Sequence, residues 1–511
     1  MMGLKSSEEV RECFVCIEID TYARSLLTGI NNLLSEQEVP AYLVGGFVRD
    51  VLLHRHTGDI DIAVAADALE IARFTARKLG GSFVALDEKN GVGRVVLADS
   101  TGVPGEGQRQ VDFSTLNGSI REDLTRRDFT INAMAIELNQ AVTDSEAVKL
   151  VDPFNGRKDL DRGIIRSVSG TTFQSDAVRL LRAARLAAEL NFSIDPDTEA
   201  QIRRHAGLIK GIAGERVREE LLRLLAVTNS GRYLVYLDKL GLLTEVIPEM
   251  EATRNIAQPK EHYWDIFQHS LKTVLAVDFL LREGTWDYDN GELLAAVPWS
   301  PELADYFRQE ISSGSTRRSL LKLAALLHDI AKPQTKSIDT NGRMRFLGHA
   351  GEGVRIVTGI MERLRFSNRE IRFVETIVKH HLRPMQMSQD GLPTRRAVYR
   401  YFRDTGEAAV EILFHNLADH LATRGPHLVP AGWQEHIEIV EYIIKENRRQ
   451  ENETRPVKLI DGHDLMNIFG MNPGVKLGEL LEAVRERQAT GEITTRQQAL
   501  EFVRQRLSTE G

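Results

Sequence analysis

The 511-residue sequence predicts an α/β head domain followed by mostly α-helical domains. Two observations predict this organisation. Between residues 41 and 170, short apolar segments typical of strands alternate with segments of helical periodicity. Further along the chain, apolar residues recur at three and four positions, as in amphipathic helices. An apolar content of 42% is sufficient for sizeable cores, and usual domain sizes give about three to four domains.

The stretch that concentrates chemistry is LVGGFVRDVLLHRHTGDIDIAV, residues 43–64. Its first strand ends at Gly45–Gly46, a pair that permits a tight turn and close approach of phosphate oxygens to backbone N–H groups. Arg49 follows in the first turn of a helix, where it can contact the same anion. The next strand carries Asp59 and Asp61, which project from one face roughly 6–7 Å apart because strand side chains alternate. Carboxylates so placed are suited to sharing metal ions.

Each half of this stretch also has an ordinary explanation. A Gly-Gly pair before a helix is usually only a turn, and Asp-x-Asp on a strand is more often a solvated face. Their order favours a functional site, because a turn suited to phosphate closely precedes a strand with paired carboxylates. Together they provide both halves of a metal–nucleotide site.

The flanking segments complete the head. Residues 1–40 have the periodicity of a helical lead-in, in which Cys13 and Cys16 are expected to pack in the core rather than to bind metal. A helix should end at Gly80–Gly81, and SFVALD, GRVVLAD and RQVDFSTL should form strands. The glycine-rich loop TGVPGEGQ precedes the last of these, which carries Asp112. If that strand lies beside the Asp-x-Asp strand, Asp112 is a third carboxylate of the site; an ordinary exposed residue is an equal alternative.

The segment REDLTRRDFTINAMAIEL follows, with a polar start and an apolar end. Arg126 and Arg127 supply guanidinium groups that match phosphate oxygens, and Asp128 and Asn132 can orient them or hydrogen-bond a ribose. Helix capping explains Asp128 but not the paired arginines. The next segment, IELNQAVTDSEAVKLVDPFNG, is expected to form a hairpin that returns to the sheet.

Four segments in this order resemble the bacterial class of tRNA nucleotidyltransferases and poly(A) polymerases: LVGGFVRDVLL, GDIDIAV, VDFSTLNGSIREDLTRRDFTINAMAI and DAVRLLRAARLAAELNF. The resemblance covers about residues 40–255 and implies a polymerase-β-like nucleotidyltransferase head with a helical neck. It also implies that Asp59 and Asp61 hold Mg²⁺, and that Gly46, Arg49 and Arg127 contact the nucleotide. The implied substrates are the tRNA 3′ end, CTP and ATP.

The neck is expected to begin with a helix over residues 175–190 that carries a polar strip of Asp176, Arg179, Arg182 and Arg185. A strip that faces only solvent is the alternative. Asp176 and Arg179 can offer an acceptor and paired donors to base edges, which would select CTP or ATP without a template. The family usually has Glu-Asp-x-x-Arg here, and Ser175 departs from it. Serine suffices if the glutamate only supports the aspartate, whereas base specificity is in question if the glutamate reads a base.

A second constellation lies in the helical region, at His269, His328, Asp329, His349, His380, His381 and Asp419. One such histidine is more often a packed core residue, but an ordered set of this kind offers a set of metal ligands inside a helical bundle. The pattern resembles an HD-type metal phosphohydrolase domain. That resemblance implies a divalent metal of undetermined identity at His269, His328, Asp329 and Asp419. His349, His380 and His381 could serve a second metal or bind phosphate.

Basic residues at 203, 204, 210, 216 and 218 suit RNA phosphates, although mixed Glu/Arg surface helices are the commoner explanation for each one. In the tail, the helix after Gly-Met-Asn-Pro-Gly begins near Lys476, where an RNA phosphate could bind. His463–Asp464 also spells His-Asp, but its flanks lack further ligands. The expected domains are a helical lead-in (1–40), the head (41–170), the neck (171–255), an HD domain with an insert (256–425) and a helical RNA-binding tail (426–511).

The function predicted from these features is addition of CMP and AMP to the 3′ end of tRNA, with possible HD phosphohydrolysis of RNA 3′ ends. The alternatives are a poly(A) polymerase, an enzyme that adds only the A or only the two Cs, and an RNA-binding protein in which the HD domain alone is active. The sequence has a net charge of −8 and no long apolar run or leader peptide, so we expect a cytoplasmic protein that does not bind membranes.

Overall fold

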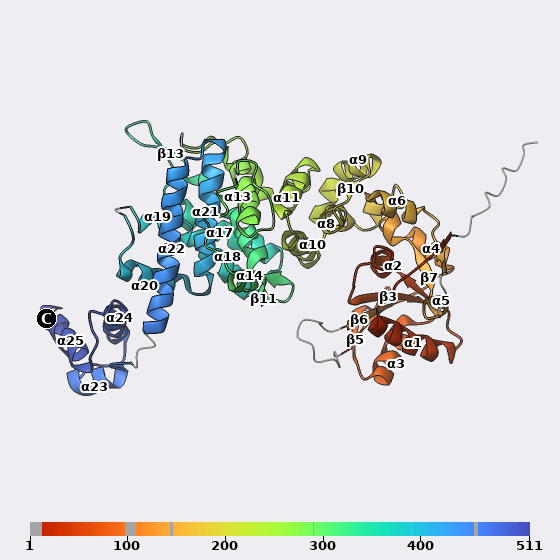
Figure 1. The fold of residues 1–511 in the computed structure, drawn as a ribbon, viewed down its shortest axis with the longest axis horizontal. Coiled ribbons are helices and arrows are strands. Elements are labelled where there is room, and N and C mark those ends of the chain that lie inside the picture. Colours follow the sequence, from red (N-terminus) through yellow and green to blue (C-terminus); the bar gives the residue numbers. More distant parts are fainter. Residues whose placement is uncertain are drawn as a thin grey trace, which may run out of the picture. The chain divides into compact units, whose positions relative to one another are not determined.

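A computed structural model of the chain shows an α/β region followed by helical regions, as the sequence predicts (Figure 1). The structure describes residues 13–97, 109–143, 147–289, 291–389, 391–453 and 458–510. The expected glycine-rich loop, residues 101–108, lies outside the described residues. The chain divides into two compact units, Met1–Gly211 and Ile212–Gly511.

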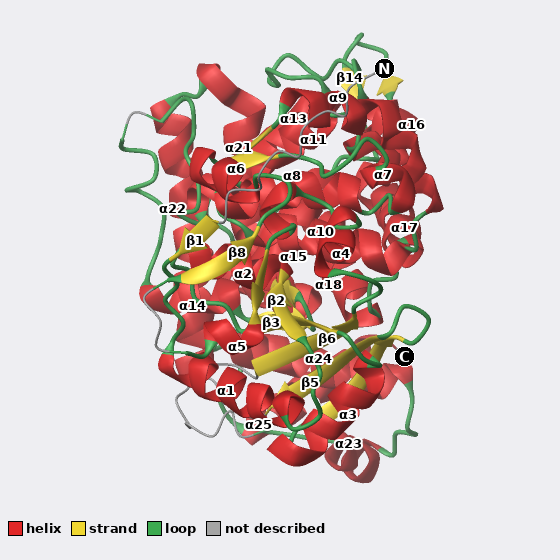
Figure 2. Cartoon of the chain, turned by 90° about the vertical axis from the view of Figure 1, so that its right-hand side faces the viewer, coloured by secondary structure: helices red, strands yellow, loops and turns green. Residues whose placement is uncertain are grey.

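The first unit is built on an eight-stranded sheet of strand order β1-β8-β7-β2-β3-β6-β5-β4. Its strands are β1 (Cys13–Val15), β2 (Ala41–Val44), β3 (Asp59–Val64), β4 (Ser82–Asp87), β5 (Val92–Leu97), β6 (Arg109–Thr115), β7 (Ala135–Glu137) and β8 (Val148–Val151). The pair β3 and β6 is parallel, and the other pairs are antiparallel. Figure 2 shows β2, β3, β6 and β5 side by side in yellow.

The two strands at the centre of this sheet alternate as the sequence predicts. On β3, Ile60 and Ile62 are fully buried, so the intervening Asp61 projects from the opposite face. On β6, Val111 and Phe113 are fully buried and Asp112 lies between them. The burial of the apolar residues therefore fixes which face of the sheet carries the carboxylates.

Three helices flank these strands: α1 (Thr21–Ser35), α2 (Gly45–Leu52) and α3 (Ala68–Leu79). Asp67 begins α3 by accepting hydrogen bonds from two backbone N–H groups, and Gly80 ends it in the left-handed conformation at φ 70°. α3 packs on β5 and β6. The predicted helix ending at Gly80–Gly81 is confirmed, as is the hairpin, which β7 and β8 form around α5 (Leu138–Ala141).

The N-terminal prediction is partly wrong. α1 is helical, but Cys13–Val15 form strand β1, antiparallel to β8, instead of the start of a helix. The edge of β8 offers backbone hydrogen bonds to this segment, and Asp20 then caps α1 by accepting from the Ala23 N–H at 2.8 Å. Both cysteines are free, and Cys16 is exposed rather than packed in the core.

The neck helix also starts later than predicted. α7 (Thr172–Ser175) ends before Asp176, whose φ of −154° is extended, and α8 runs over Arg179–Leu190. The Asp176 carboxylate accepts from the Val178 N–H at 3.3 Å. Short polar side chains compete with helical hydrogen bonding in this way, so Asp176 precedes α8 instead of lying within it.

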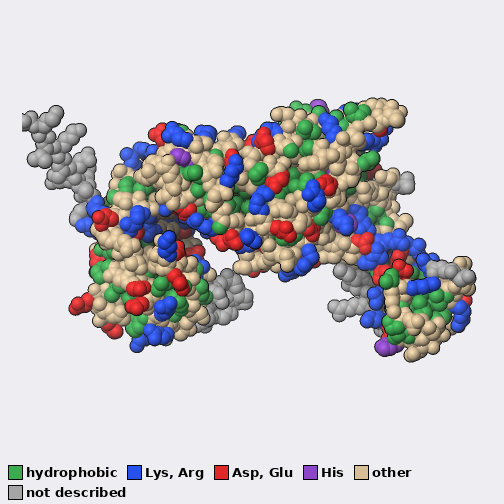
Figure 3. Space-filling view, turned by 180° about the vertical axis from the view of Figure 1, so that it is seen from behind, with side chains coloured by type: hydrophobic (Ala, Val, Ile, Leu, Met, Phe, Trp, Pro, Cys, Tyr) green, Lys and Arg blue, Asp and Glu red, His purple; other side chains and the backbone are tan. Residues whose placement is uncertain are grey.

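The second unit is a helical bundle. Its main helices are α10 (Gly214–Ala226), α11 (Ser230–Lys239), α13 (Ile266–Leu280), α15 (Arg317–Leu327), α17 (His349–Arg363), α18 (Asn368–His380), α20 (Arg395–Thr405), α21 (Ala409–Arg424) and α22 (Pro430–Glu453). α13 packs against α11, α15 and α21. The expected insert contains the short helix α14 (Pro301–Arg308). In Figure 3, basic and acidic side chains are interspersed over the visible face, which agrees with ordinary mixed surface helices.

The tail has helices α23 (Gly462–Phe469), α24 (Val475–Ala489) and α25 (Arg496–Glu510) around a small core that includes Leu465, Val484 and Val503. Glutamates of α24 bind arginines of α20: Arg400 lies 2.7 Å from Glu486, and Arg403 lies 3.3 Å from Glu482. Among the described residues, no helix is both long and apolar enough to cross a membrane.

Replacing Leu465 with alanine should unfold the tail locally, because this side chain is fully buried in a small core. Loss of such a residue costs about 2–5 kcal/mol. Hydrogen–deuterium exchange should show faster exchange in α23–α25 and unchanged exchange in α13 and α15. Ile468→Ala is the matched control on the same helix, since Ile468 is 45% exposed. Equal exchange in the two variants would contradict this packing.

Candidate functional site

Three carboxylates of the head lie on neighbouring strands. The parallel pairing of β3 with β6 sets Asp61 directly opposite Asp112, and Asp59 precedes Asp61 on the same face. Asp112 is therefore on the strand next to Asp-x-Asp, which is the condition that the sequence left open.

The start of α2 approaches the same point. Gly45 has φ 68°, and a Cβ atom there would lie 2.8 Å from both Arg127 Nη1 and Asp61 Oδ2. Any larger residue would collide with these two groups, and its backbone would be strained. The Gly46 N–H donates to the Asp61 carboxylate. The glycine pair thus brings backbone donors, a carboxylate and an arginine together.

Asp61 is poised to accept a cation. Its pKa is raised to about 6, mainly by burial; Arg127 opposes this shift, and the neighbouring Asp112 and Asp59 carboxylates add to it. The raised pKa means that nearby positive charge does not fully compensate the ionised Asp61 carboxylate. A divalent cation would supply that compensating charge. This supports the expected metal role of Asp59 and Asp61.

The head carboxylates are not yet gathered as ligands. Among the described residues, the groups of three or more whose ligand atoms all lie within 4.8 Å of one another are in the helical bundle, not in the head. Asp112 is bound by Arg94, and Asp61 by the Gly46 N–H.

Four of the predicted nucleotide-binding residues form one hydrogen-bonded network. Arg49 Nη1 donates to Asn132 Oδ1 at 2.9 Å, and Asn132 Nδ2 donates to Asp128 Oδ1 at 3.1 Å. Arg182 Nη1 donates to Asp128 Oδ2 at 3.1 Å. Burial alone would raise the pKa of Asp128, but Arg182 and Asn132 hold it below its usual range. The network links α2 to the neck helix α8.

Arg179 is held by neutral oxygens at the start of α8. Its Nη2 donates to the Arg126 carbonyl at 2.7 Å, and its Nη1 lies 3.2 Å from Ser175 Oγ. Burial lowers the pKa of Arg179. Ser175 therefore contacts the predicted base-reading arginine directly, at the position where the family resemblance leads us to expect glutamate.

Arg185 does not belong to the predicted polar strip. It is 5% exposed, and its Nη1 lies 2.5 Å from Glu189. The helix that buries Leu181 and Ala188 also buries this arginine, so the expectation of four polar residues along one accessible face is wrong. Asp176 is partly buried at the turn before α8.

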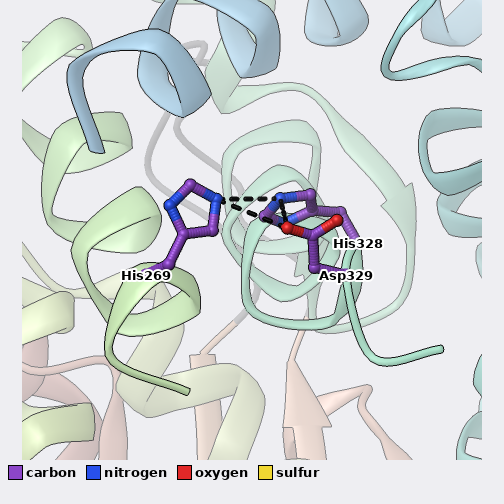
Figure 4. Close-up of side chains that lie close together, drawn as sticks. All are labelled: His269, His328 and Asp329. Atoms are coloured by element: carbon purple, nitrogen blue, oxygen red, sulfur yellow. Dashed lines mark hydrogen bonds and ion pairs between the residues drawn. The ribbon is translucent and has the colours of Figure 1, made fainter. Parts of the chain in front are cut away.

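The second constellation comes together inside the helical bundle. His269 on α13 has its Nε2 3.3 Å from His328 Nε2 and 3.0 Å from Asp419 Oδ1 on α21. His328 Nε2 is 3.1 Å from Asp329 Oδ2 (Figure 4). All four predicted HD ligands thus converge, although they come from helices far apart in the sequence.

Asp329 also faces a second group. Its Oδ1 lies 3.4 Å from His349 Nε2 and 4.0 Å from His381 Nε2, and these two nitrogens are 3.3 Å apart. Asp329 therefore presents one oxygen to His269 and His328 and the other to His349 and His381. His380 faces the other side of α18, beside Lys379 and Arg383, so the expectation that it joins the cluster is not supported.

The histidine tautomers suit metal ions. The Nδ1 atoms of His328, His349 and His381 contact the carbonyls of Ala325, Phe346 and Val378 at 2.7–2.9 Å. A carbonyl only accepts, so each Nδ1 carries a proton, and a neutral ring then presents an Nε2 lone pair to the cluster. Burial would lower the pKa of His328, but the Asp329 carboxylate outweighs it and raises that pKa. Burial, followed by the neighbouring His328, lowers the pKa of His381 to about 3, so this ring is neutral. Facing lone pairs repel unless a cation lies between them.

Lys332 completes this cluster. Its Nζ lies 2.6 Å from Asp329 Oδ2 and donates to Gln258 Oε1 at 2.7 Å. The same Asp329 oxygen lies 3.1 Å from His328 Nε2. Carboxylate oxygens beside imidazole nitrogens are ligands that divalent transition metals accept.

Segments of this chain match the models of known protein families. Family models match the poly(A) polymerase head domain at residues 41–166, a probable RNA-binding site of polymerase A at 191–253, an HD domain at 299–469 and a tRNA nucleotidyltransferase domain at 443–503. The A-adding tRNA nucleotidyltransferase of Deinococcus radiodurans is 33% identical, with 91% of this chain and 94% of that protein covered. The CC-adding enzyme of Thermus thermophilus is 32% identical, covering 91% and 93%.

The chain belongs to the tRNA nucleotidyltransferase family.

Solved structures agree with this family at the level of fold. A CCA-adding enzyme in complex with ATP is 23% identical and superposes with a TM-score of 0.63, with 98% of each chain covered. The Thermotoga maritima CCA-adding enzyme in complex with tRNA has a TM-score of 0.58 at 23% identity, with 97% and 99% covered. The predicted family and fold class are confirmed, and the chain is a nucleotidyltransferase by descent.

Three residues of these sites were not singled out from the sequence. Asp123 binds both arginines of the motif, at 3.0 Å from Arg126 and 3.2 Å from Arg127, and its spacing of three and four within one helical segment was the available signal. Lys332 follows Asp329 by three residues, which is a similar signal. Arg94 offered none, because strand register decides its contact with Asp112.

Divalent metal binding to the head should weaken below pH 6, since Asp61 must lose its proton and burial raises its pKa to about 6. Mn²⁺ affinity should fall by about tenfold per pH unit between pH 6 and pH 5. The measurement is Mn²⁺ titration followed by electron paramagnetic resonance, in an Asp329→Asn chain so that the bundle does not contribute. An affinity that is flat to pH 4.5 would contradict the shifted pKa.

Proposed function

We propose that this chain adds CMP and AMP from CTP and ATP to the 3′ end of tRNA, without a template. The observation that carries the proposal is the arrangement around Asp61. Asp59-x-Asp61 lies beside Asp112 on a paired strand and against the glycine turn that begins α2. Curated relatives matched along almost the whole chain add nucleotides to tRNA, and this supports the same substrate class.

The reaction joins the RNA 3′-oxygen to the α-phosphorus of the nucleotide and breaks the bond to pyrophosphate. Arg49 and Arg127 lie where they can neutralise the triphosphate, and backbone N–H groups at the start of α2 face the same point. Asp128 and Asn132 hold Arg49 in place and can bind a ribose. Asp176 and Arg179 would select the base, once Arg179 leaves the carbonyls that hold it.

Asp59 and Asp61 would hold Mg²⁺, which when bound neutralises charge on the phosphates and lowers the pKa of a coordinated hydroxyl. The elevated pKa of Asp61, at about 6, marks the site whose charge such an ion would compensate. Asp112 lies on the neighbouring strand, on the side from which Asp61 projects.

A partial activity is a specific second candidate. The relatives covering 91% of the chain include one A-adding and three CC-adding enzymes. Ser175, where the resemblance leads us to expect glutamate, contacts Arg179, which is predicted to select the base. An A-only or CC-only enzyme therefore fits the same metal site with a different nucleotide choice.

Incubation with tRNA that lacks its 3′ trinucleotide, and with tRNA ending in CC, should distinguish these activities. We expect incorporation from labelled CTP and ATP, and sequencing of the products gives the number and identity of added nucleotides. Asp59→Asn and Asp61→Asn should each lower incorporation by at least about 10³-fold, because the charge that binds the metal is lost. Asp161→Asn is the matched control, since Asp161 is 57% exposed and pairs with Arg157.

The outcomes separate the alternatives. Addition of A alone, of CC alone or of long A tails identifies the respective subtype. No incorporation on any acceptor would overturn the transferase proposal and leave the HD domain as the sole active part.

We further propose that the bundle hydrolyses phosphate esters at RNA 3′ ends. Asp329 lies between His269–His328 and His349–His381, so these five residues would hold divalent metal ions in two neighbouring groups. Such ions activate water and bind phosphate oxygens. Hydrolysis of a 2′,3′-cyclic phosphate would place water oxygen on phosphorus and break one ester bond. Lys332, whose Nζ lies 2.6 Å from Asp329 Oδ2, would add positive charge for the phosphate.

Metal analysis tests this pairing. After gel filtration, elemental analysis should find about two metal ions per chain. Asp329→Asn should lose both ions, because Asp329 belongs to both ligand groups. His349→Ala should lose one ion, because His349 belongs to one group. His463→Ala is the matched control in the second His-Asp pair, whose histidine is exposed. A two-metal centre would be contradicted if the intact chain held one ion and His349→Ala retained that ion.

A further inference from the structure

One charged side chain contacts the transferase carboxylates and has no role in the reaction described above. Arg94 on β5 donates from Nε to Asp112 Oδ1 at 2.7 Å and from Nη2 to Asp112 Oδ2 at 2.8 Å. Its guanidinium thus binds both oxygens of Asp112. This fork geometry fixes direction as well as distance, which a lysine could not do.

Strand register builds this contact. β5 and β6 are antiparallel with Arg94 opposite Asp112, and β6 and β3 are parallel with Asp112 opposite Asp61. The three residues therefore stand in one row across three neighbouring strands. Side chains directly opposite one another project from the same face, so Arg94, Asp112 and Asp61 share one surface of the sheet.

The row also places Arg94 in the field of the other two carboxylates. The hydrogen bonds to Asp112 raise the pKa of Arg94, and the charges of Asp59 and Asp61 raise it further. Arg94 is the cation at one end of the row, and Arg127 lies at the other, near Asp61 and Gly45. Three carboxylates are thus flanked by two guanidinium groups.

The Asp112 side chain is 23% exposed, and without a partner it would sample several rotamers. Binding by Arg94 removes this freedom, yet each carboxylate oxygen keeps a further lone pair. Resting on the proposed transferase function, we propose that Arg94 is a positioning residue: it holds Asp112 in one rotamer beside Asp61, with the remaining carboxylate lone pairs available to the reacting groups.

An ordinary ion pair on a sheet is the competing explanation, and such pairs contribute little to stability. Loss of the Arg94 charge and loss of the fixed Asp112 position predict opposite effects on metal binding. Removing Arg94 takes one positive charge from the carboxylates, which by itself would tighten Mg²⁺ binding. Loss of position would weaken it, because Asp112 would no longer be preorganised. The direction of the change therefore distinguishes the two roles.

The experiment compares Arg94→Gln, Arg94→Lys and the intact chain in CMP incorporation at varied Mg²⁺. For Arg94→Gln we expect kcat to fall on the order of 10²-fold at saturating Mg²⁺ and the half-saturating Mg²⁺ concentration to rise several-fold. KM for CTP should change less than about threefold, since Arg94 binds a carboxylate and not the nucleotide. Arg94→Lys should recover part of kcat, because it restores the charge but not the fork.

Arg73→Gln is the matched control. Arg73 is an exposed arginine of α3 that stacks on Phe83 with its Cζ 4.9 Å from the ring centroid, and it does not contact the carboxylates. Its variant should match the intact chain, and thermal denaturation should show that all variants fold. An unchanged or lower half-saturating Mg²⁺ concentration in Arg94→Gln, with kcat within threefold of the intact chain, would overturn the positioning role.

Failure of the transferase proposal would be separable. If the intact chain incorporates no nucleotide, Mn²⁺ binding to the head, measured by electron paramagnetic resonance in an Asp329→Asn background, still tests Arg94. Weaker Mn²⁺ binding in the added Arg94→Gln variant supports positioning of Asp112. Equal or tighter binding contradicts it.

Discussion

The parallel pairing of β3 with β6 is the constraint on which the transferase site depends. It is the one parallel pair of the described head sheet, and it places Asp61 opposite Asp112. A shift of one residue in either strand would turn its carboxylate toward the core and an apolar residue outward. Full burial of Ile60, Ile62, Val111 and Phe113 opposes such a shift, so the packing of the head maintains the spacing of its charges.

The two candidate sites share one electrostatic property. In the head, burial and neighbouring carboxylates raise the pKa of Asp61 to about 6, and in the bundle, the Nε2 atoms of His349 and His381 lie 3.3 Å apart. Each arrangement brings together groups that a divalent cation can bind. A divalent cation relieves both, but in different ways: oxygen ligands in the head suit Mg²⁺, whereas imidazoles in the bundle suit transition metals.

Local patterns predicted the head well, because period-two alternation and glycine turns are properties of short segments. The strand that carries Asp59 and Asp61, the helix before Gly80 and the identities of the four HD ligands were all available from such patterns or from the family resemblance. The structure brings the HD ligands together as expected. The predictions failed where a competing local contact decides the conformation, as at Asp176, whose carboxylate caps the next turn, and at Cys13–Val15, which pair with β8.

Register and long-range packing could not be predicted from the sequence. The contact of Arg94 with Asp112 depends on how β5 aligns with β6, and the position of Asp329 between two histidine pairs depends on how α15, α17 and α18 pack. Both arrangements bring together residues that are far apart in the chain. The burial of Arg185 beside Glu189 likewise reflects the neighbours of α8 rather than the spacing of its arginines.

The central claim is that Asp61 and its neighbours bind a metal ion that contacts the α-phosphate during transfer. Incorporation from the two α-thio diastereomers of CTP, in Mg²⁺ and in the more thiophilic Cd²⁺, tests it most directly. We predict that one diastereomer reacts slowly in Mg²⁺, that Cd²⁺ restores its incorporation by at least about tenfold, and that Asp61→Asn abolishes this rescue. Equal incorporation of both diastereomers in either metal would contradict the claim.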